Sequence, residues 1–210
     1  VERTKERKLK DFQKKLASLS FLDPACGSGN FLTETYLTLR RLENEVLRVL
    51  SRGQIAFGDA NWNPIQVSLG QFYGIEINDF AVTVAKTALW IAESQMMKET
   101  EEIVLMHLEF LPLNSYTNII EANALRINWD DVVPKQKLNY IMGNPPFIGA
   151  RLMEQGSVQK KEVQDIFGNI KDVQDLDYVT CWYKLAAQYI QNTNIQACFV
   201  STNSICQGSQ

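Results

Sequence analysis

The chain has 210 residues, of which 45% are apolar and 21% are charged, and these proportions are close to the average of globular proteins. This composition excludes a disordered chain and a collagen-like chain. No apolar run approaches the roughly 18 residues that a membrane span requires, and no charged-then-apolar leader follows Val1. We therefore expect one main domain, located in the cytoplasm and without a membrane partner.

Cysteine and histidine are too sparse for the common metal and nucleophile chemistries. The single histidine is His107, and no Cys-x-x-Cys pair occurs among the four cysteines, Cys26, Cys181, Cys198 and Cys206. A zinc site needs closer ligand pairs, and one histidine offers little for a catalytic triad. We expect free thiols and no bound metal.

Basic residues are concentrated at the start of a chain whose formal net charge is −3. Residues 1–20 carry seven Lys or Arg against three acids, so the other 190 residues have a net charge of −7. Such a run usually forms the solvated face of a helix, although it would also suit contact with phosphates. We predict a basic N-terminal helix within residues 1–18 and a main domain over 19–210.

Apolar strand-like segments alternate with amphipathic helix-like segments along the chain. Strands are predicted over 20–23, 72–77, 118–123, 138–142 and 195–201. Helices are predicted over 9–19, from Asn30, from Asn78 or Asp79, and over 176–190. Loops are predicted over 51–70, 98–116 and 149–174. The buried stripes are predicted to hold Leu9, Phe12, Leu16 and Leu19 in the first helix, and Phe80, Val84, Ala88 and Ile91 in the helix after 78.

This alternation of strands and helices predicts an α/β fold, with helices on both faces of a parallel sheet. Ligands of such sheets bind beyond the carboxyl ends of the strands. The candidate site residues are therefore those that directly follow each predicted strand.

The first strand ends in the turn Asp23-Pro-Ala-Cys-Gly-Ser-Gly-Asn-Phe31. Only Gly27 and Gly29 match the dinucleotide pattern, and the Gly-Lys-[Ser/Thr] of a triphosphate loop is absent. A carboxylate beside this turn would repel a pyrophosphate and attract a cation. S-adenosylmethionine carries a sulfonium and an ammonium group, so the turn suits this cofactor.

Two further strand ends carry polar residues that could hold a nucleoside. Glu76 could accept hydrogen bonds from ribose hydroxyls, and Asn123 could contact an adenine edge. Each also has an ordinary interpretation, since an acid is common at a helix start and an asparagine is common in a turn.

The fourth strand runs into Asn144-Pro-Pro-Phe147. An exocyclic amine is a poor nucleophile because its lone pair is delocalised into the ring. The Asn144 side-chain oxygen and the Pro145 carbonyl could accept the amine hydrogens and favour a pyramidal nitrogen, and preset dipoles of this kind are effective catalysts. Phe147 could stack on the base. A plain Pro-Pro turn that closes the strand is the structural alternative.

These three motifs, Asp-Pro-Ala-Cys-Gly-Ser-Gly-Asn-Phe-Leu, Gly-Ile-Glu-Ile and Asn-Pro-Pro-Phe, in that order, resemble the gamma-class amino-methyltransferases that form N6-methyladenine in DNA. The similarity runs from about Leu19 to Gln210 and is strongest to type IIG and IIL fused restriction-modification proteins. Weaker matches of the same subgroup are Asn123-Ala-Leu-Arg, Asp175-Leu-Asp-Tyr-Val and Ser201-Thr-Asn-Ser-Ile-Cys-Gln-Gly.

The resemblance implies a Rossmann-like class I S-adenosylmethionine-dependent methyltransferase core, a truncated three-layer αβα sandwich with a mostly parallel sheet in strand order 3-2-1-4-5. Asp23, Gly27 and Gly29 would cradle the methionine part of the cofactor and Glu76 its ribose. Asn123 stands where the family usually has an Asp. The implied cofactor-binding residues are Asp23, Pro24, Ala25, Gly27, Gly29, Phe31, Glu76, Ile77, Asn123 and Ala124, and the implied catalytic residues are Asn144, Pro145, Pro146 and Phe147.

The implied substrate is a flipped adenine in double-stranded DNA, because the amino group is buried in the duplex. The implied context is a bacterial cytoplasmic restriction-modification protein whose recognition domain, last strands and possible nuclease lie in other parts of the same polypeptide. Related Asn-Pro-Pro-aromatic enzymes methylate guanine in ribosomal RNA or a protein glutamine, often with Tyr where this chain has Phe147. A non-catalytic cofactor-binding scaffold is a further alternative, which the intact Asn144 and Phe147 disfavour.

Overall fold

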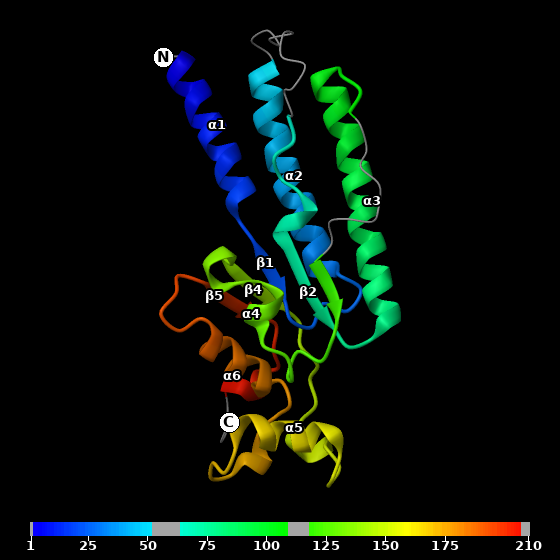
Figure 1. Cartoon of the computed structure of the whole chain (residues 1–210), viewed down its shortest axis with the longest axis vertical. Coiled ribbons are helices and arrows are strands. Elements are labelled where there is room, and N and C mark those ends of the chain that lie inside the picture. The colour runs from blue at the N-terminus through cyan, green and yellow to red at the C-terminus, as the bar shows by residue number, and fades with distance from the viewer. Residues whose placement is uncertain (1, 52–63, 109–117, 207–210) are drawn as a thin grey trace.

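A five-stranded sheet forms the centre of the computed structural model, which describes residues 2–51, 64–108 and 118–206 (Figure 1). All strand pairs are parallel, and the order is β3-β2-β1-β4-β5. This confirms the predicted order 3-2-1-4-5. The strands are β1 (Phe21–Asp23), β2 (Phe72–Glu76), β3 (Asn118–Glu121), β4 (Tyr140–Gly143) and β5 (Gln196–Phe199).

Helices cover both faces of the sheet, which confirms the three-layer α/β class. α2 and α3 pack on one face and α4 and α6 on the other, while α5 lies beyond the carboxyl ends of the strands (Figure 1). Among the described residues, no helix is both long and apolar enough to cross a bilayer. The helices are α1 (Glu2–Ser18), α2 (Asn30–Ser51), α3 (Asp79–Val104), α4 (Trp129–Val132), α5 (Val158–Phe167) and α6 (Thr180–Tyr189).

Alternating side chains of the strands build two separate cores. Phe21 and Phe72 face α2 and α3, whereas Leu22 and Ile141 face α4 and α6. On the first face, the rings of Phe72, Phe21 and Tyr140 form a ladder across three strands, with centroids 5.4 Å apart at each step. This ladder holds β2, β1 and β4 in register, so the strand ends that carry the motifs lie side by side.

The structure corrects the predicted course of α3. The prediction of a loop from residue 98 was wrong, because the helix runs on to Val104; residues 109–116 lie outside the described part. The predicted stripe was also wrong: Phe80 and Ile91 are exposed and Val84 and Ala88 are only half-buried. The buried positions are instead Val82, Ala85, Leu89, Ala92, Met96, Thr100 and Val104. The polar residues near the end of α3 misled the prediction, because one of them, Thr100, is buried against α2 through bonds to Arg40 and Asn44.

Two further expectations are corrected. The segment 149–174, predicted as a loop, contains α5, and the helix predicted over 176–190 begins later, at Thr180. α1 starts earlier than the helix predicted over 9–19, and its buried positions are Gln13 and Leu16 rather than Phe12, whose side chain is 41% exposed. The predicted loop over 51–70 lies largely outside the described residues.

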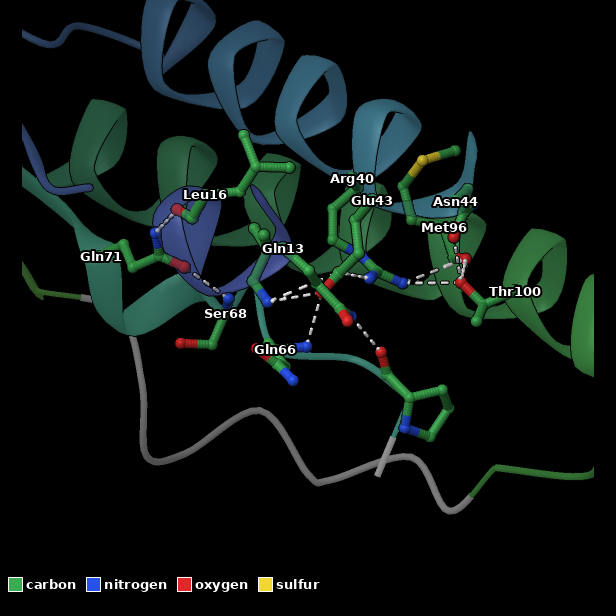
Figure 2. Close-up of polar contacts among 12 residues, drawn as sticks. Gln13, Leu16, Arg40, Glu43, Asn44, Gln66, Ser68, Gln71, Met96 and Thr100 are labelled. Carbon is green, nitrogen blue, oxygen red and sulfur yellow. Dashed lines mark hydrogen bonds and ion pairs between the residues drawn. The ribbon is translucent and has the colours of Figure 1, made fainter. Parts of the chain in front are cut away.

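A buried ion pair joins α1, α2 and α3 on the side away from the strand ends that carry the motifs (Figure 2). Arg40 and Glu43 are both fully buried and bond to each other. Arg40 Nη2 donates to Thr100 Oγ1 of α3 at 2.7 Å. The Glu43 carboxylate accepts from Gln13 Nε2 of α1 at 2.9 Å and from the backbone N–H of Gln66 at 2.7 Å. The pair therefore connects three helices and the segment before β2, with Glu43 bonded to α1 and to Gln66 and Arg40 bonded to α3.

We expect Arg40→Met to lower the free energy of unfolding by about 3–5 kcal/mol, because the Glu43 carboxylate would stay buried without its cation. The double variant Arg40→Met/Glu43→Gln should be more stable than Arg40→Met, since the new amide oxygen still accepts from Gln66 N–H without a charge. Arg48→Met is the control, because the ion pairs of Arg48 lie at the surface and such pairs contribute little to stability. Urea titration measures all three, and a loss below 1 kcal/mol for Arg40→Met would contradict this account.

Candidate active site

The two motif loops meet where β1 and β4 end side by side. Asp23 closes β1 and Gly143 closes β4, and β1 pairs with β4. A Cβ atom at position 143 would overlap Asp23 Oδ1, so glycine is needed there to admit the carboxyl group. The turn after Asp23 and the loop that begins at Asn144 are therefore neighbours, as the strand order predicted.

The turn after β1 needs both of its glycines. Gly27 and Gly29 have φ angles of +53° and +81°, in the left-handed region that glycine adopts without strain. A side chain at Gly29 would also come within 2.9 Å of Ala85 Cβ of α3. At Gly27, apart from its chain neighbours, no atom of the described residues lies within 4 Å of an added Cβ, so the outer side of this residue is open to a ligand.

The Glu76 carboxylate ties the end of β2 to this turn. Its oxygens accept from the backbone N–H groups of Gly27 at 2.9 Å, Ile77 at 2.9 Å and Asn78 at 3.0 Å. Carboxylate oxygens have capacity for more hydrogen bonds than these. The next residue, Ile77, is 66% exposed at the same strand end. The ribose-binding role of Glu76 stays a prediction, and the structure adds a second function for it in shaping the turn.

Asp23 is buried and holds its proton unusually tightly. Its pKa is raised to about 7, chiefly by burial and to a smaller extent by the negative charge of Glu76, against the opposing hydrogen bond from Ala25 N–H. Loss of the proton near neutral pH would place a second negative charge near Glu76. A cationic ligand would favour that charged state.

The Asn144-Pro-Pro-Phe147 loop exposes three of its four side chains, those of Asn144, Pro146 and Phe147. Asn144 is exposed and, within the described residues, its side chain makes no hydrogen bond. Pro145 is buried and anchors the loop, while the Phe147 ring is 42% exposed. The binding of a planar amine by this loop stays a prediction, and the exposure of Asn144 and Phe147 is compatible with it.

Asn123 follows the carboxyl end of β3, and its side chain is already hydrogen-bonded within the protein. Its Nδ2 donates to Glu162 Oε1 of α5 at 2.7 Å, and its Oδ1 accepts from Leu125 N–H at 2.9 Å. The neighbouring Ala124 is buried in the core beside α4. A contact between Asn123 and an adenine stays a prediction.

Pro24 and Phe31 lie on either side of the turn. The carbonyl of Pro24 accepts from Trp182 Nε1 of α6 at 3.1 Å, so this end of the turn is fastened to the α6 layer. Phe31 lines an open apolar cavity of about 560 Å³ between α2 and the β1–β4 face, together with residues that include Phe21 and Tyr140. Phe31 thus faces a cavity beside the strands.

Three supporting residues were missed by the sequence analysis, namely Glu162, Tyr178 and Trp182. A usable signal existed for the helix that carries Glu162, because Ser157 is a good N-cap residue and Val163, Ile166 and Phe167 follow at helical spacing. The bonding of Glu162 could not be foreseen, since it depends on residues 36 to 39 positions before it.

Comparison with known proteins places the chain. The family model described as MmeI, DNA-methyltransferase domain, matches residues 1–210. The chain belongs to this family. Membership in the MmeI methyltransferase-domain family confirms the predicted resemblance to type IIL restriction-modification proteins.

Two relatives of the MmeI methyltransferase domain are similar over nearly the whole chain. DNA methyltransferase A of Bacillus subtilis (strain 168) is 43% identical over 206 residues, which are 97% of this chain and 23% of that protein. The solved structure of the type IIL restriction-modification enzyme MmeI in complex with DNA matches with a TM-score of 0.88 at 47% identity, covering 98% of this chain and 27% of the MmeI chain. The chain spans about a quarter of the length of each relative.

The raised pKa of Asp23 predicts a pH-dependent stability. Between the ordinary carboxyl pKa near 4 and about 7, the folded chain binds a proton that the unfolded chain has lost, so stability falls as pH rises, by at most about 1.4 kcal/mol per pH unit. Asp23→Asn should remove this part of the slope. Urea midpoints at pH 5, 6 and 7 measure it, with the exposed Asp165→Asn as control. Equal slopes for wild type and Asp23→Asn would contradict the assignment.

Proposed function

We propose that this chain is the catalytic part of a restriction-modification enzyme that transfers the methyl group of S-adenosylmethionine to the N6 amino group of adenine in double-stranded DNA. The observation that carries the proposal is the close approach of Asp23 to the backbone of Gly143. Because of it, the turn after β1, which we expect to bind the methyl donor (the donor side), lies beside the loop after β4, which we expect to bind the methyl acceptor (the acceptor side). Membership in a DNA-methyltransferase family supports it. The corresponding location is the bacterial cytoplasm.

The residues of the donor side fit S-adenosylmethionine. Two carboxyl groups, Asp23 and Glu76, face one turn and favour a ligand with positive charge. The open side of Gly27 admits a ligand close to the backbone, and exposed Ile77 and Phe80 offer apolar surface for a purine ring. When bound, S-adenosylmethionine supplies an electrophilic methyl group.

The residues of the acceptor side fit a planar amine. Asn144 Oδ1 and the Pro145 carbonyl accept the two amine hydrogens, which favours the pyramidal nitrogen and frees its lone pair. The Phe147 ring stacks on the base and holds it outside the duplex, where such stacking contributes about 1–3 kcal/mol per base. After methyl transfer the nitrogen carries a surplus proton, which leaves to solvent, so no general base is needed.

DNA is favoured over the other acceptors because the solved MmeI structure is a complex with DNA. Ribosomal RNA, a protein glutamine and a scaffold without catalysis remain alternatives to be tested. The recognition domain, and a nuclease where present, would be supplied by the parts of the full-length protein outside this chain.

We expect Asn144→Ala in the full-length protein to lower the single-turnover rate of methyl transfer by about 10²–10³-fold, the usual cost of one preorganised hydrogen-bonding group. Its affinity for S-adenosylmethionine should stay nearly unchanged, because Asn144 contacts the target amine rather than the cofactor. Phe147→Ala should also weaken retention of the flipped base, reported by a fluorescent base analogue at the target position. A parental rate for Asn144→Ala would overturn the methyl-transfer mechanism in favour of the scaffold.

Glu76→Ala should weaken S-adenosylmethionine binding by about 1.5–3 kcal/mol, the value of hydrogen bonds to a charged group. The loss combines the ribose contacts with the support that Glu76 gives to Gly27 N–H. Glu121→Ala is the matched control, because this exposed acid occupies the paired position at the end of β3 and should bind the cofactor normally. Calorimetry that shows unchanged affinity for Glu76→Ala would remove Glu76 from the donor site.

A further inference from the structure

Glu162 is a buried carboxylate at the edge of the sheet that carries both motif loops. It belongs to α5 and is 3% exposed. Three side chains donate to it: Asn123 Nδ2 at 2.7 Å, Arg126 Nε at 3.0 Å and Tyr178 hydroxyl at 2.5 Å. The pKa of Tyr178 is raised by burial and by its bond to Glu162, so its hydroxyl keeps the proton that it donates. Burying a carboxylate is costly unless its hydrogen bonds are satisfied, and here they are.

The donors of Glu162 connect it to both sides of the candidate site. Asn123 is the residue at the predicted adenine end of the donor site. Tyr178 donates its backbone N–H to the carbonyl of Ile148 at 2.9 Å, directly after Phe147 of the acceptor loop. One carboxylate thus joins the turn after β3 to the loop after β4.

A third connection runs through aromatic packing. The Tyr178 ring meets the Trp182 ring edge-on, with centroids 5.2 Å apart. Trp182 Nε1 in turn donates to the carbonyl of Pro24 at 3.1 Å in the turn after β1. The loops after three strands are therefore held from α5 and α6 through a single set of contacts.

Glu162 also accounts for the asparagine at position 123, where the resembled family usually has an aspartate. An aspartate there would place a second carboxylate about 3 Å from buried Glu162, and like charges at that distance repel strongly. The amide of Asn123 instead donates to Glu162. Asn123 and Glu162 therefore form a hydrogen-bonded pair of one amide and one carboxylate.

The geometry points to Glu162 as a positioning residue, which fixes the donor and acceptor sides of the site relative to each other through Asn123 and Tyr178. This inference rests on the proposed function, because it needs a reaction in which both sides must be aligned. A misplacement of about 1 Å can cost on the order of 10²-fold in rate.

Exchanging the two groups provides the test in the full-length protein. Asn123→Asp should set two carboxylates against each other and lower both S-adenosylmethionine affinity and the single-turnover rate, each by about tenfold or more. The double variant Asn123→Asp/Glu162→Gln restores one carboxylate and one amide with the hydrogen bond reversed, and it should recover most of both losses. Asp165→Asn, an exposed acid on the same helix, should match wild type in both.

Thermal melting of each variant separates alignment from folding. If Asn123→Asp fails to fold, a folded double variant with near-parental affinity and rate still confirms the pairing. A double variant no better than Asn123→Asp, or an Asn123→Asp variant with parental affinity and rate, would overturn the positioning role while wild type stays active. Wild-type protein that methylates no DNA would instead contradict the proposed function.

Discussion

The site depends on one buried carboxyl group. Asp23 occupies the space that a side chain at Gly143 would fill, so β1 and β4 can end at the same level with their loops in contact. Any larger residue at 143 would displace the carboxyl group or separate the strands. Burial in this space also raises the pKa of Asp23 to about 7, so a nearby cation would favour its ionised form. The position of Asp23 against Gly143 thus determines both how closely the two strands pack and how the carboxyl group would respond to a cation.

The loops around Asp23 are held by side chains rather than by regular structure. Glu76 fastens the first turn through Gly27 N–H, and Trp182 fastens its other end through the Pro24 carbonyl. Glu162 of α5 binds Asn123 in the turn after β3 and Tyr178, whose backbone contacts the loop after β4. Away from these loops, the Arg40–Glu43 pair plays the same part for α1, α2 and α3 (Figure 2). Buried polar groups therefore connect both the loops and the helices, and the two apolar cores set the layers.

The sequence was sufficient for the fold wherever local pattern and burial agree. The strand order was implied by the family that the three motifs resemble, and the starts of β2 and α2 were predicted to the residue. The end of α3 was missed because Thr100 is buried through bonds to Arg40, 60 positions earlier. The same limit applies to the site. Turn glycines and the Asn-Pro-Pro-Phe loop are visible locally, whereas the partner of Asn123 lies on α5 and becomes apparent only after folding.

The central claim is that the neighbouring turns after β1 and β4 bring a methyl donor to the amino group of adenine. The most direct measurement gives the full-length protein unmethylated duplex DNA together with S-adenosylmethionine that carries an isotope in its methyl group. The DNA is then digested to nucleosides and analysed by mass spectrometry. The account predicts that the isotope appears in N6-methyladenine. Its appearance in a methylated cytosine, or its absence from the DNA while RNA or protein becomes labelled, would contradict the account.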